Sequence, residues 1–255
     1  MAPLQKKFEI KENKKLNETT FKIVFNAPEI ASIAKAGQFV NILCENRTLR
    51  RPISICETEP DKGLVKIVFD VRGEGTAWLS KQKSGKKIDI LGPLGNGFPC
   101  EKGNRALLIG GGLGVPPLLE TTKFFGKKAD AILGFKCKEN LILLENFKQI
   151  CENTYLTSDD GSCGTRGLVT DVMQDLIKTK DYDIVYACGP EAMLKSVAKI
   201  CSENKLACFV SLEERMGCGI GACLVCACAV KVNGEVDYKH VCKDGPVFNA
   251  REVAW

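Results

Sequence analysis

Hydrophobic positions in the first hundred residues come in short runs that alternate with turn-forming glycine, proline and asparagine. The runs lie at residues 21–25, 38–43, 51–56, 64–71 and 88–91. Strands of this length and spacing are typical of a β-barrel or a β-sandwich. The pattern therefore predicts an all-β unit over roughly residues 1–101.

The middle of the chain changes to an alternation of strands and helices. We expect a strand at residues 105–109, then a glycine cluster and a helix that ends near residue 125. Further strands are expected at 129–136 and 183–187, with a helix at 191–204 after the last of them. This βα repetition predicts a parallel sheet with helices on its faces over residues 102–211.

The last segment, residues 212–255, is rich in glycine and cysteine and shows no long periodic element. A segment this short cannot build a sufficient hydrophobic core of its own, so it needs an additional stabilising element such as a disulfide or a bound metal. The sequence thus predicts an α+β chain of three units with boundaries at 1–101, 102–211 and 212–255.

Composition and charge narrow the class of protein. Hydrophobic residues make up 45% of the 255 residues and charged residues 26%, which is typical of soluble globular chains. No apolar run of about 18 residues predicts a membrane span, and the start lacks the apolar region of a signal peptide. The net charge of +5 is spread evenly, which does not favour nucleic-acid binding. We expect a cytoplasmic protein without membrane or nucleic-acid partners.

Cysteine is the unusual component, because the chain has 14 cysteines and one histidine. Cys218, Cys223 and Cys226 follow the spacing C-x4-C-x2-C, and Cys242 comes later. This is the plant-type spacing of a 2Fe–2S cluster. The glycines between the first cysteines let the loop wrap around inorganic sulfide and point backbone N–H groups at it.

Other interpretations of the cysteines remain open at this point. They are a structural zinc site, a pair of disulfides, or inert buried thiols; zinc sites usually show two short C-x2-C knuckles, which this segment lacks. A Rieske centre is excluded, because it needs two histidines and the chain has only His240. Cys228 competes with Cys226, since both would face the same side of a strand, but the spacing favours Cys226.

A glycine-rich turn follows the strand at 105–109 and opens a helix. Its glycines permit a tight turn and a close approach of backbone N–H groups to a phosphate. It departs from G-x-G-x-x-G, because the third glycine would fall at Pro117. Taken alone, this motif is therefore more typical of an ordinary βα turn than of a nucleotide-binding turn. Loops at 157–162 and 187–191 also follow strands, so the three loops are expected to converge at the carboxyl edge of the sheet.

Two motifs of the first unit indicate a diphosphate ligand. Arg51 can hold a diphosphate, while the hydroxyl of Ser54 can reach a ring nitrogen or carbonyl. The segment 73–76 is typical of a phosphate-binding turn at a helix start, with Thr76 as a cap. Taken alone, each motif is more typical of a structural role, as an edge arginine and as an ordinary capped helix.

Together, the motifs at 51–54, 73–76, 110–114 and 188–190 resemble those of the ferredoxin–NADP reductase superfamily, in the same chain order. The cysteine motif and the segment 240–248 narrow the resemblance to the electron-transfer subunits of dihydroorotate dehydrogenase B. The resemblance covers nearly the whole chain. It implies a FAD-binding antiparallel β-barrel at 1–101, an NAD-binding α/β domain at 102–211 and a 2Fe–2S domain at 212–255.

The resemblance also implies site residues. Those for FAD are Arg51, Pro52, Ile53, Ser54, Val68, Phe69, Asp70, Gly75 and Thr76. Those for NAD(H) are Gly110, Gly111, Gly112 and Gly114 of the glycine turn, with Cys188 and Gly189 near the nicotinamide. The implied cluster ligands are Cys218, Cys223, Cys226 and Cys242.

The implied function is electron transfer between NAD(H), FAD and the cluster, and onward to or from an FMN-containing catalytic subunit. That subunit would convert dihydroorotate to orotate in pyrimidine biosynthesis with NAD+ as acceptor, in a heterotetramer of two subunits of each kind. No residue of this chain would act as acid or base on the pyrimidine. The alternatives are a related FAD/2Fe–2S reductase subunit serving ferredoxin, NADP or sulfur acceptors, and a non-catalytic redox sensor. Residues 136–139 do not separate NAD from NADP, but the resemblance favours NAD.

Overall fold

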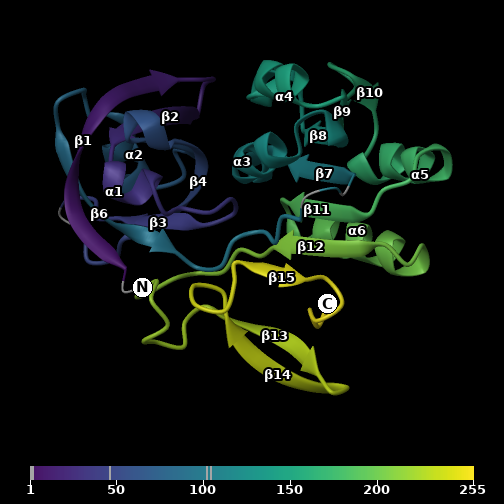
Figure 1. Ribbon diagram of the computed structural model, residues 1–255. Helices are drawn as coiled ribbons and strands as arrows, with labels where there is room; N and C mark the ends of the chain where they lie inside the picture. The colour runs from purple at the N-terminus through teal and green to yellow at the C-terminus, as the bar shows by residue number, and fades with distance from the viewer. Residues whose placement is uncertain (1–2, 46, 102, 104) are drawn as a thin grey trace.

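The computed structural model describes residues 3–45, 47–101, 103 and 105–255. Its first part is a closed antiparallel barrel, drawn in purple and blue in Figure 1, with the strand order β1-β2-β5-β4-β3-β6. The strands are β1 (Leu4–Lys15), β2 (Thr20–Asn26), β3 (Phe39–Ile42), β4 (Arg51–Glu59), β5 (Leu64–Asp70) and β6 (Lys87–Leu94). Two short helices, α1 (Pro28–Ala31) and α2 (Glu74–Ser80), lie between strands. The predicted antiparallel barrel is confirmed.

Alternation of side chains along the strands builds the interior of the barrel. Val40 and Ile42 of β3 belong to the barrel core, while Phe39 of the same strand belongs to a different hydrophobic cluster outside it. Successive residues of a strand face opposite sides, so β3 has one face in the barrel and one face toward the rest of the chain. This second face meets the C-terminal segment.

The second part is a seven-stranded sheet in the order β10-β9-β8-β7-β11-β12-β15. Its parallel strands are β7 (Ala106–Gly111), β8 (Ala129–Phe135), β9 (Asn153–Ser158), β10 (Thr165–Arg166), β11 (Ile184–Cys188) and β12 (Ala207–Ser211). The accompanying helices are α3 (Val115–Phe125), α4 (Leu144–Ile150), α5 (Val169–Thr179) and α6 (Glu191–Glu203). The predicted parallel sheet with covering helices is confirmed.

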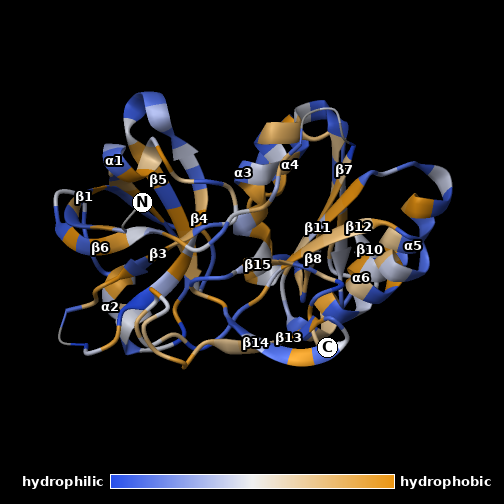
Figure 2. Ribbon diagram, turned by 60° about the horizontal axis from the view of Figure 1, so that its bottom comes forward, coloured by the Kyte–Doolittle hydropathy of each residue, from blue (hydrophilic) through white to orange (hydrophobic). Residues whose placement is uncertain are grey.

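Central strands of this sheet are hydrophobic along their whole length. Figure 2 shows β7, β11 and β12 mostly in orange, next to helices of mixed colour. All residues of β7 and of β11 are buried. Strands that are covered on both faces need apolar residues at every position, which explains why the pattern is continuous rather than alternating.

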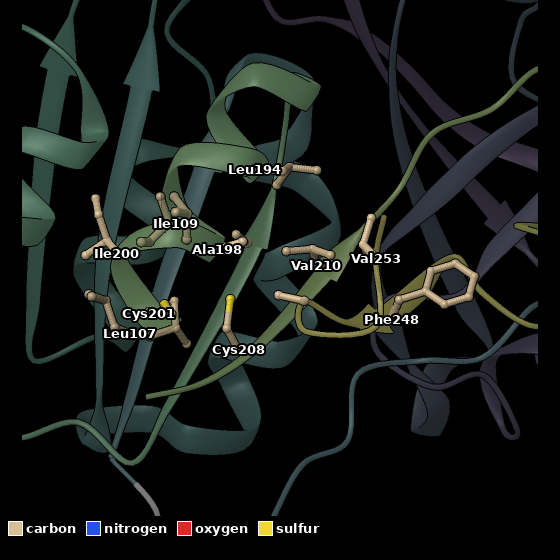
Figure 3. Packing of buried hydrophobic residues seen from close by; sticks show 14 of the residues in the cluster. Leu107, Ile109, Leu194, Ala198, Ile200, Cys201, Cys208, Val210, Phe248 and Val253 are labelled. Atoms are coloured by element: carbon tan, nitrogen blue, oxygen red, sulfur yellow. The ribbon is translucent and has the colours of Figure 1, made fainter. Parts of the chain in front are cut away.

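The third part begins with the cysteine loop and the hairpin of β13 (Ala227–Val232) and β14 (Glu235–His240). The chain then returns to the large sheet, where β15 (Val247–Asn249) pairs antiparallel with β12. Figure 3 shows Phe248 and Val253 of this segment beside Val210 of β12. Phe39 and Leu94 of the barrel belong to the same hydrophobic cluster. The cysteine segment therefore packs against both the barrel and the sheet.

The barrel and the sheet also contact each other directly, through α3 and β4. Glu120 of α3 accepts hydrogen bonds from the backbone N–H and the hydroxyl of Thr58, at 2.9 and 3.2 Å. Lys123 of α3 forms an ion pair with Glu57 of β4.

The boundaries at 101/102 and 211/212 stay predictions. Among the described residues, no helix has both the length and the apolar character to span a membrane.

Candidate functional site

The cysteine loop turns its backbone N–H groups toward sulfur. The N–H groups of Ile220, Ala222 and Cys223 lie 3.5, 3.3 and 3.4 Å from the Cys218 Sγ. The N–H of Gly221 lies 3.1 Å from the Cys242 Sγ. Backbone donors arranged in this way stabilise negative charge on thiolates and on inorganic sulfide.

The four candidate cysteines fall into two pairs. The Sγ atoms of Cys226 and Cys242 are 3.3 Å apart, and the backbone N–H of Cys223 lies 3.4 Å from the Cys218 Sγ. Within the described residues, no three His, Cys, Asp or Glu side chains gather closely enough to hold one metal ion. Four cysteine thiolates are the donor set of a 2Fe–2S cluster. The residues present fit a 2Fe–2S cluster.

Electrostatics at the loop act in opposite directions on two of the thiols. Burial raises the pKa of Cys218, but the N–H groups of Ile220, Cys223 and Ala222 outweigh burial and lower it to about 6. Burial, together with the contact to Cys226, raises the pKa of Cys242 to about 12. Metal ligands must be thiolates, so Cys242 would have to give up its proton to act as a ligand.

Cys228 is placed differently from Cys226. Cys226 lies in the loop just before β13, where its sulfur contacts Cys242. Cys228 lies within β13 opposite Lys239, and burial raises its pKa to about 11. No hydrogen bond joins Cys228 to another cysteine in the part of the chain that the structure describes. This placement favours Cys226 as the ligand.

Glycine is required at two positions of the loop. Gly219 and Gly221 have φ of +76° and +79°, which other L-residues rarely adopt. A Cβ on Gly221 would lie 2.7 Å from Cδ of Lys243, and one on Gly219 would lie 2.3 Å from Nδ2 of Asn41. Because these two residues have no side chain, the loop packs closely against the segment after Cys242 and against the barrel.

Some of the residues predicted to bind FAD come together at the start of α2. A Cβ on Gly75 would lie 2.6 Å from Nε of Arg51, so the guanidinium rests directly over the first turn of this helix. The hydroxyl of Thr76 accepts hydrogen bonds from the N–H groups of Arg72 and Gly73, at 3.0 and 3.2 Å. Thr76 thus supports the turn that precedes the helix, and Arg51 places a positive charge beside its first turn, of the kind that can bind a diphosphate.

Other residues predicted for FAD divide between two faces of the barrel wall. Pro52 and Ser54 lie on the outer face of β4, whereas Ile53 and Phe69 belong to the barrel core. Val68 of β5 packs in the cluster beside α3. Asp70 of β5 accepts a 2.6 Å hydrogen bond from Thr20. Because their side chains are inside the barrel, Ile53 and Phe69 offer only their backbone to an outer ligand.

The glycine turn and the residues after β11 contact each other. A Cβ on Gly114 would lie 2.0 Å from the carbonyl oxygen of Cys188, and one on Gly111 would lie 2.7 Å from Sδ of Met193. A Cβ on Gly110 would lie 2.8 Å from Cγ2 of Val115. Packing within the fold therefore accounts for three of the four glycines. Burial raises the pKa of the Cys188 thiol to about 12, so this side chain is uncharged.

Gly112 is the exception within the turn. Its φ is +54°, and a Cβ there would have open space around it within the described residues. The loop after β9 lies two strands away from β7, where Ser162 accepts a 2.8 Å hydrogen bond from the N–H of Lys138 after β8. The predicted loops thus share the carboxyl edge of the sheet, and the turn contacts residues 188–193 there.

Comparison with known proteins agrees with this geometry. Residues 213–254 match the model of the iron-sulfur cluster binding domain of dihydroorotate dehydrogenase B. Residues 108–199 match the oxidoreductase NAD-binding domain. An electron transfer subunit of dihydroorotate dehydrogenase B (NAD(+)) from Bacillus caldolyticus is 42% identical and covers 92% of this chain and 93% of its own. The chain belongs to the family of dihydroorotate dehydrogenase B electron transfer subunits. A member from Geobacillus sp. (strain WCH70) is 40% identical over 98% of both chains.

Solved structures extend the comparison of this family member. The structure of an NADH-dependent reduced ferredoxin-NADP oxidoreductase, studied for flavin-based electron bifurcation, has a TM-score of 0.86 and 34% identity. It covers 97% of this chain and 90% of its own. A flavohemoglobin from Malassezia yamatoensis with bound FAD and heme has a TM-score of 0.65 and 18% identity, covers 81% of this chain and 59% of its own, and shares the fold alone.

The structure also adds contacts of the cysteine segment that motif analysis missed. Asn41 of β3 is 1% exposed and donates to the carbonyl of Cys218 at 3.4 Å. Asn96 donates to the carbonyls of Lys243 and Asp244, at 3.1 and 2.9 Å. Neither asparagine lies in a recognised motif. A polar residue inside the otherwise apolar run of β3 was the only available signal for Asn41.

Proposed function

We propose that this chain passes electrons between NAD(H), FAD and a 2Fe–2S cluster, and exchanges them with an FMN-containing dihydroorotate dehydrogenase subunit. The observation that carries the proposal is the cysteine loop, whose paired thiols face backbone N–H groups while the loop packs against both barrel and sheet. A cluster held at this place lies next to both cofactor-binding parts of the fold. Family membership supports the same function.

The cofactors supply the redox chemistry: a flavin exchanges two electrons as hydride with nicotinamide and single electrons with a one-electron cluster. The chain supplies binding and orientation. Arg51 at the start of α2 would neutralise the diphosphate of FAD, and the outer face of β4 would support the ring beside Pro52 and Ser54. The glycine turn and residues 188–189 would receive NAD(H) at the edge of the sheet.

The four thiolates would hold the cluster, and the N–H groups of the loop would stabilise the charge on its sulfurs. The relay requires no acid or base on the pyrimidine from this chain. The proposed assembly contains two copies of this chain and two catalytic subunits, and orotate formation would deliver electrons to NAD+.

A reconstituted complex with the catalytic subunit tests the relay. The Cys223→Ser variant removes one thiolate of the first pair, so we expect loss of the cluster and of NAD+-dependent orotate formation, with FAD retained. Cys201→Ala is the matched control, because it removes a buried thiol from α6, which carries no candidate ligand. Normal NAD+-dependent orotate formation by the Cys223→Ser complex would contradict the relay.

A second candidate function rests on the solved oxidoreductase at 34% identity. In that case, the same cofactors would serve a ferredoxin or NADP-linked partner. Affinity purification of the native complex separates the two candidates. Recovery of an FMN-containing dihydroorotate dehydrogenase supports the first candidate, whereas recovery of a ferredoxin- or NADP-linked flavoprotein supports the second.

A further inference from the structure

The outer face of β3 connects the two sites that the proposed function assigns to flavin and cluster. Asn41 lies on this face, since its neighbours Val40 and Ile42 both point into the barrel core. The side chain of Asn41 is buried against the cysteine loop, 177 residues away in the sequence. A barrel residue thus contacts the backbone that carries the first candidate ligand.

The contact between Asn41 and the loop is close. Nδ2 of Asn41 donates to the carbonyl of Cys218 at 3.4 Å, and the position of a Cβ on Gly219 would be only 2.3 Å from the same nitrogen. The amide therefore occupies the space that a side chain at residue 219 would need. Any change in the position of the loop relative to β3 must displace this amide.

The other end of the Asn41 amide is unsatisfied. Oδ1 is buried and has no hydrogen-bond partner among the described residues. A buried polar atom without a partner destabilises a fold, so its presence in a native protein calls for a physical explanation. Stability alone would favour an apolar residue of similar size at this position.

Strand register places Asn41 beside the flavin-binding strand. In the pairing of β3 with β4, Asn41 lies opposite Pro52, and Phe39 lies opposite Ser54. Side chains of directly opposite residues share one face of the sheet, with Cβ atoms about 4.5–5.5 Å apart. The face that would support the flavin ring and the face that holds the cysteine loop are therefore one surface.

A second asparagine restrains the other ligand segment. Asn96 follows β6 and donates to the carbonyls of Lys243 and Asp244, directly after Cys242. Its own N–H donates to the carbonyl of Gly245 at 2.6 Å. Both segments that carry candidate ligands are thus tied to residues of the first hundred, one through Asn41 and one through Asn96.

We propose that Asn41 is a positioning residue, which fixes the cysteine loop against the flavin-binding face of β3 and β4 and so sets the rate of electron transfer between FAD and the cluster. The proposal rests on the proposed function for the identity of the two cofactors. Asn41 acts through the backbone of Cys218 and Gly219 rather than on a reacting atom.

Anaerobic stopped-flow mixing of the loaded chain with NADH tests the proposal. Flavin and cluster bleaching are followed separately in the unmodified chain, in Asn41→Leu and Asn41→Ala, and in Ile42→Val as the control on the opposite face of the same strand. We expect unchanged flavin reduction in all four proteins. Cluster reduction should be several-fold slower in both Asn41 variants, because electron transfer slows steeply as the distance between donor and acceptor increases.

Hydrogen exchange of the amides of residues 219–223 provides a readout that does not depend on turnover. Release of the loop in the Asn41 variants should speed this exchange, whereas Ile42→Val should not change it. Cluster content, measured as iron per chain, normalises the rates. This separates a lost cluster from a displaced one.

Two results would overturn the proposal. One is cluster reduction at the rate of the unmodified chain, per loaded cluster, in both Asn41 variants. The other is unchanged exchange of residues 219–223. Failure of the proposed function can be distinguished from failure of this proposal, because NADH would then reduce neither flavin nor cluster in the unmodified chain. In that case the exchange result alone decides whether Asn41 positions the loop.

Discussion

Substitution of Gly114 by alanine should disrupt the proposed nicotinamide site without touching the flavin barrel. Gly114 has φ of −76° and ψ of −11°, a conformation that alanine adopts freely, so the effect is one of contact. The added Cβ would lie 2.0 Å from the carbonyl oxygen of Cys188 and 2.5 Å from the nitrogen of Gly189. Real Cβ atoms do not approach other atoms closer than 3.0 Å. The two loops must therefore separate by about 1 Å, a misplacement that can cost about a hundredfold in rate.

The assay for Gly114→Ala is anaerobic reduction of the bound flavin by NADH in a stopped-flow instrument. We expect the second-order rate to fall about a hundredfold, while dithionite still reduces flavin and cluster fully. Overpacking of this kind also costs about 1–3 kcal/mol of stability, so folding is checked by circular dichroism. Gly234→Ala in the β13–β14 turn is the control for a destabilising glycine substitution outside the site: its φ of +88° strains an alanine, but a Cβ there meets nothing within 4 Å in the described part of the chain. If NADH reduces the flavin of Gly114→Ala as fast as the flavin of the control, the assignment of residues 188–189 to the nicotinamide site is refuted.

Three further predictions concern the cluster, the flavin and the core. Cys226→Ser should lose its iron, whereas Cys228→Ser should keep about two irons per chain, as measured by iron analysis; the reverse result would exchange their roles. Arg51→Gln should weaken FAD binding about tenfold or more, because a charge-assisted contact is lost; FAD release on dilution measures this, and equal retention would contradict it. Burial opposes ionisation of Asp130, but hydrogen bonds from Lys180 and other donors lower its pKa from 3.8 to about 2. Because the folded pKa is the lower one, this carboxylate stabilises the fold above about pH 4 and loses about 2 kcal/mol as the pH falls toward 2. Asp130→Asn should lack that contribution at pH 7, and its free energy of unfolding in urea should depend less on pH. An unchanged free energy of unfolding at pH 7 would contradict the stabilising role of the Asp130 carboxylate.

Much of the fold could be predicted because hydrophobic patterns report directly on burial. The short runs of the barrel and the continuous apolar strands of the sheet gave recognisable signals. Strand β1 was missed because Phe8 and Ile10 are its only buried hydrophobic residues among many lysines and glutamates. Helix α5 was also missed, although its apolar residues recur with helical spacing.

The site was predictable only as far as local motifs extend. The spacing of the cysteines indicated the cluster ligands and favoured Cys226, and the contact of Cys226 with Cys242 gives a structural reason to prefer it to Cys228. Side-chain direction was not predictable for Phe69, which points into the barrel. Asn41 lies far in sequence from the loop that it contacts, and no local pattern reveals such a pairing.

Return of the last segment to the sheet is a further feature without a sequence signal. Strand β15 has three residues and pairs antiparallel with β12, too short a run to show a period. Its packing gives the cysteine segment the core that so short a unit lacks by itself. Tertiary contacts rather than local propensity determine this element.

The central claim is that nicotinamide, flavin and cluster form one relay in this chain. The most direct test is an anaerobic titration of the purified protein with NADH, followed by absorption and by electron paramagnetic resonance. The account predicts a flavin band and a broad iron–sulfur absorption that both bleach, together with the signal of a reduced 2Fe–2S cluster. A colourless protein that contains zinc, or a flavin and cluster that NADH leaves oxidised, would contradict it.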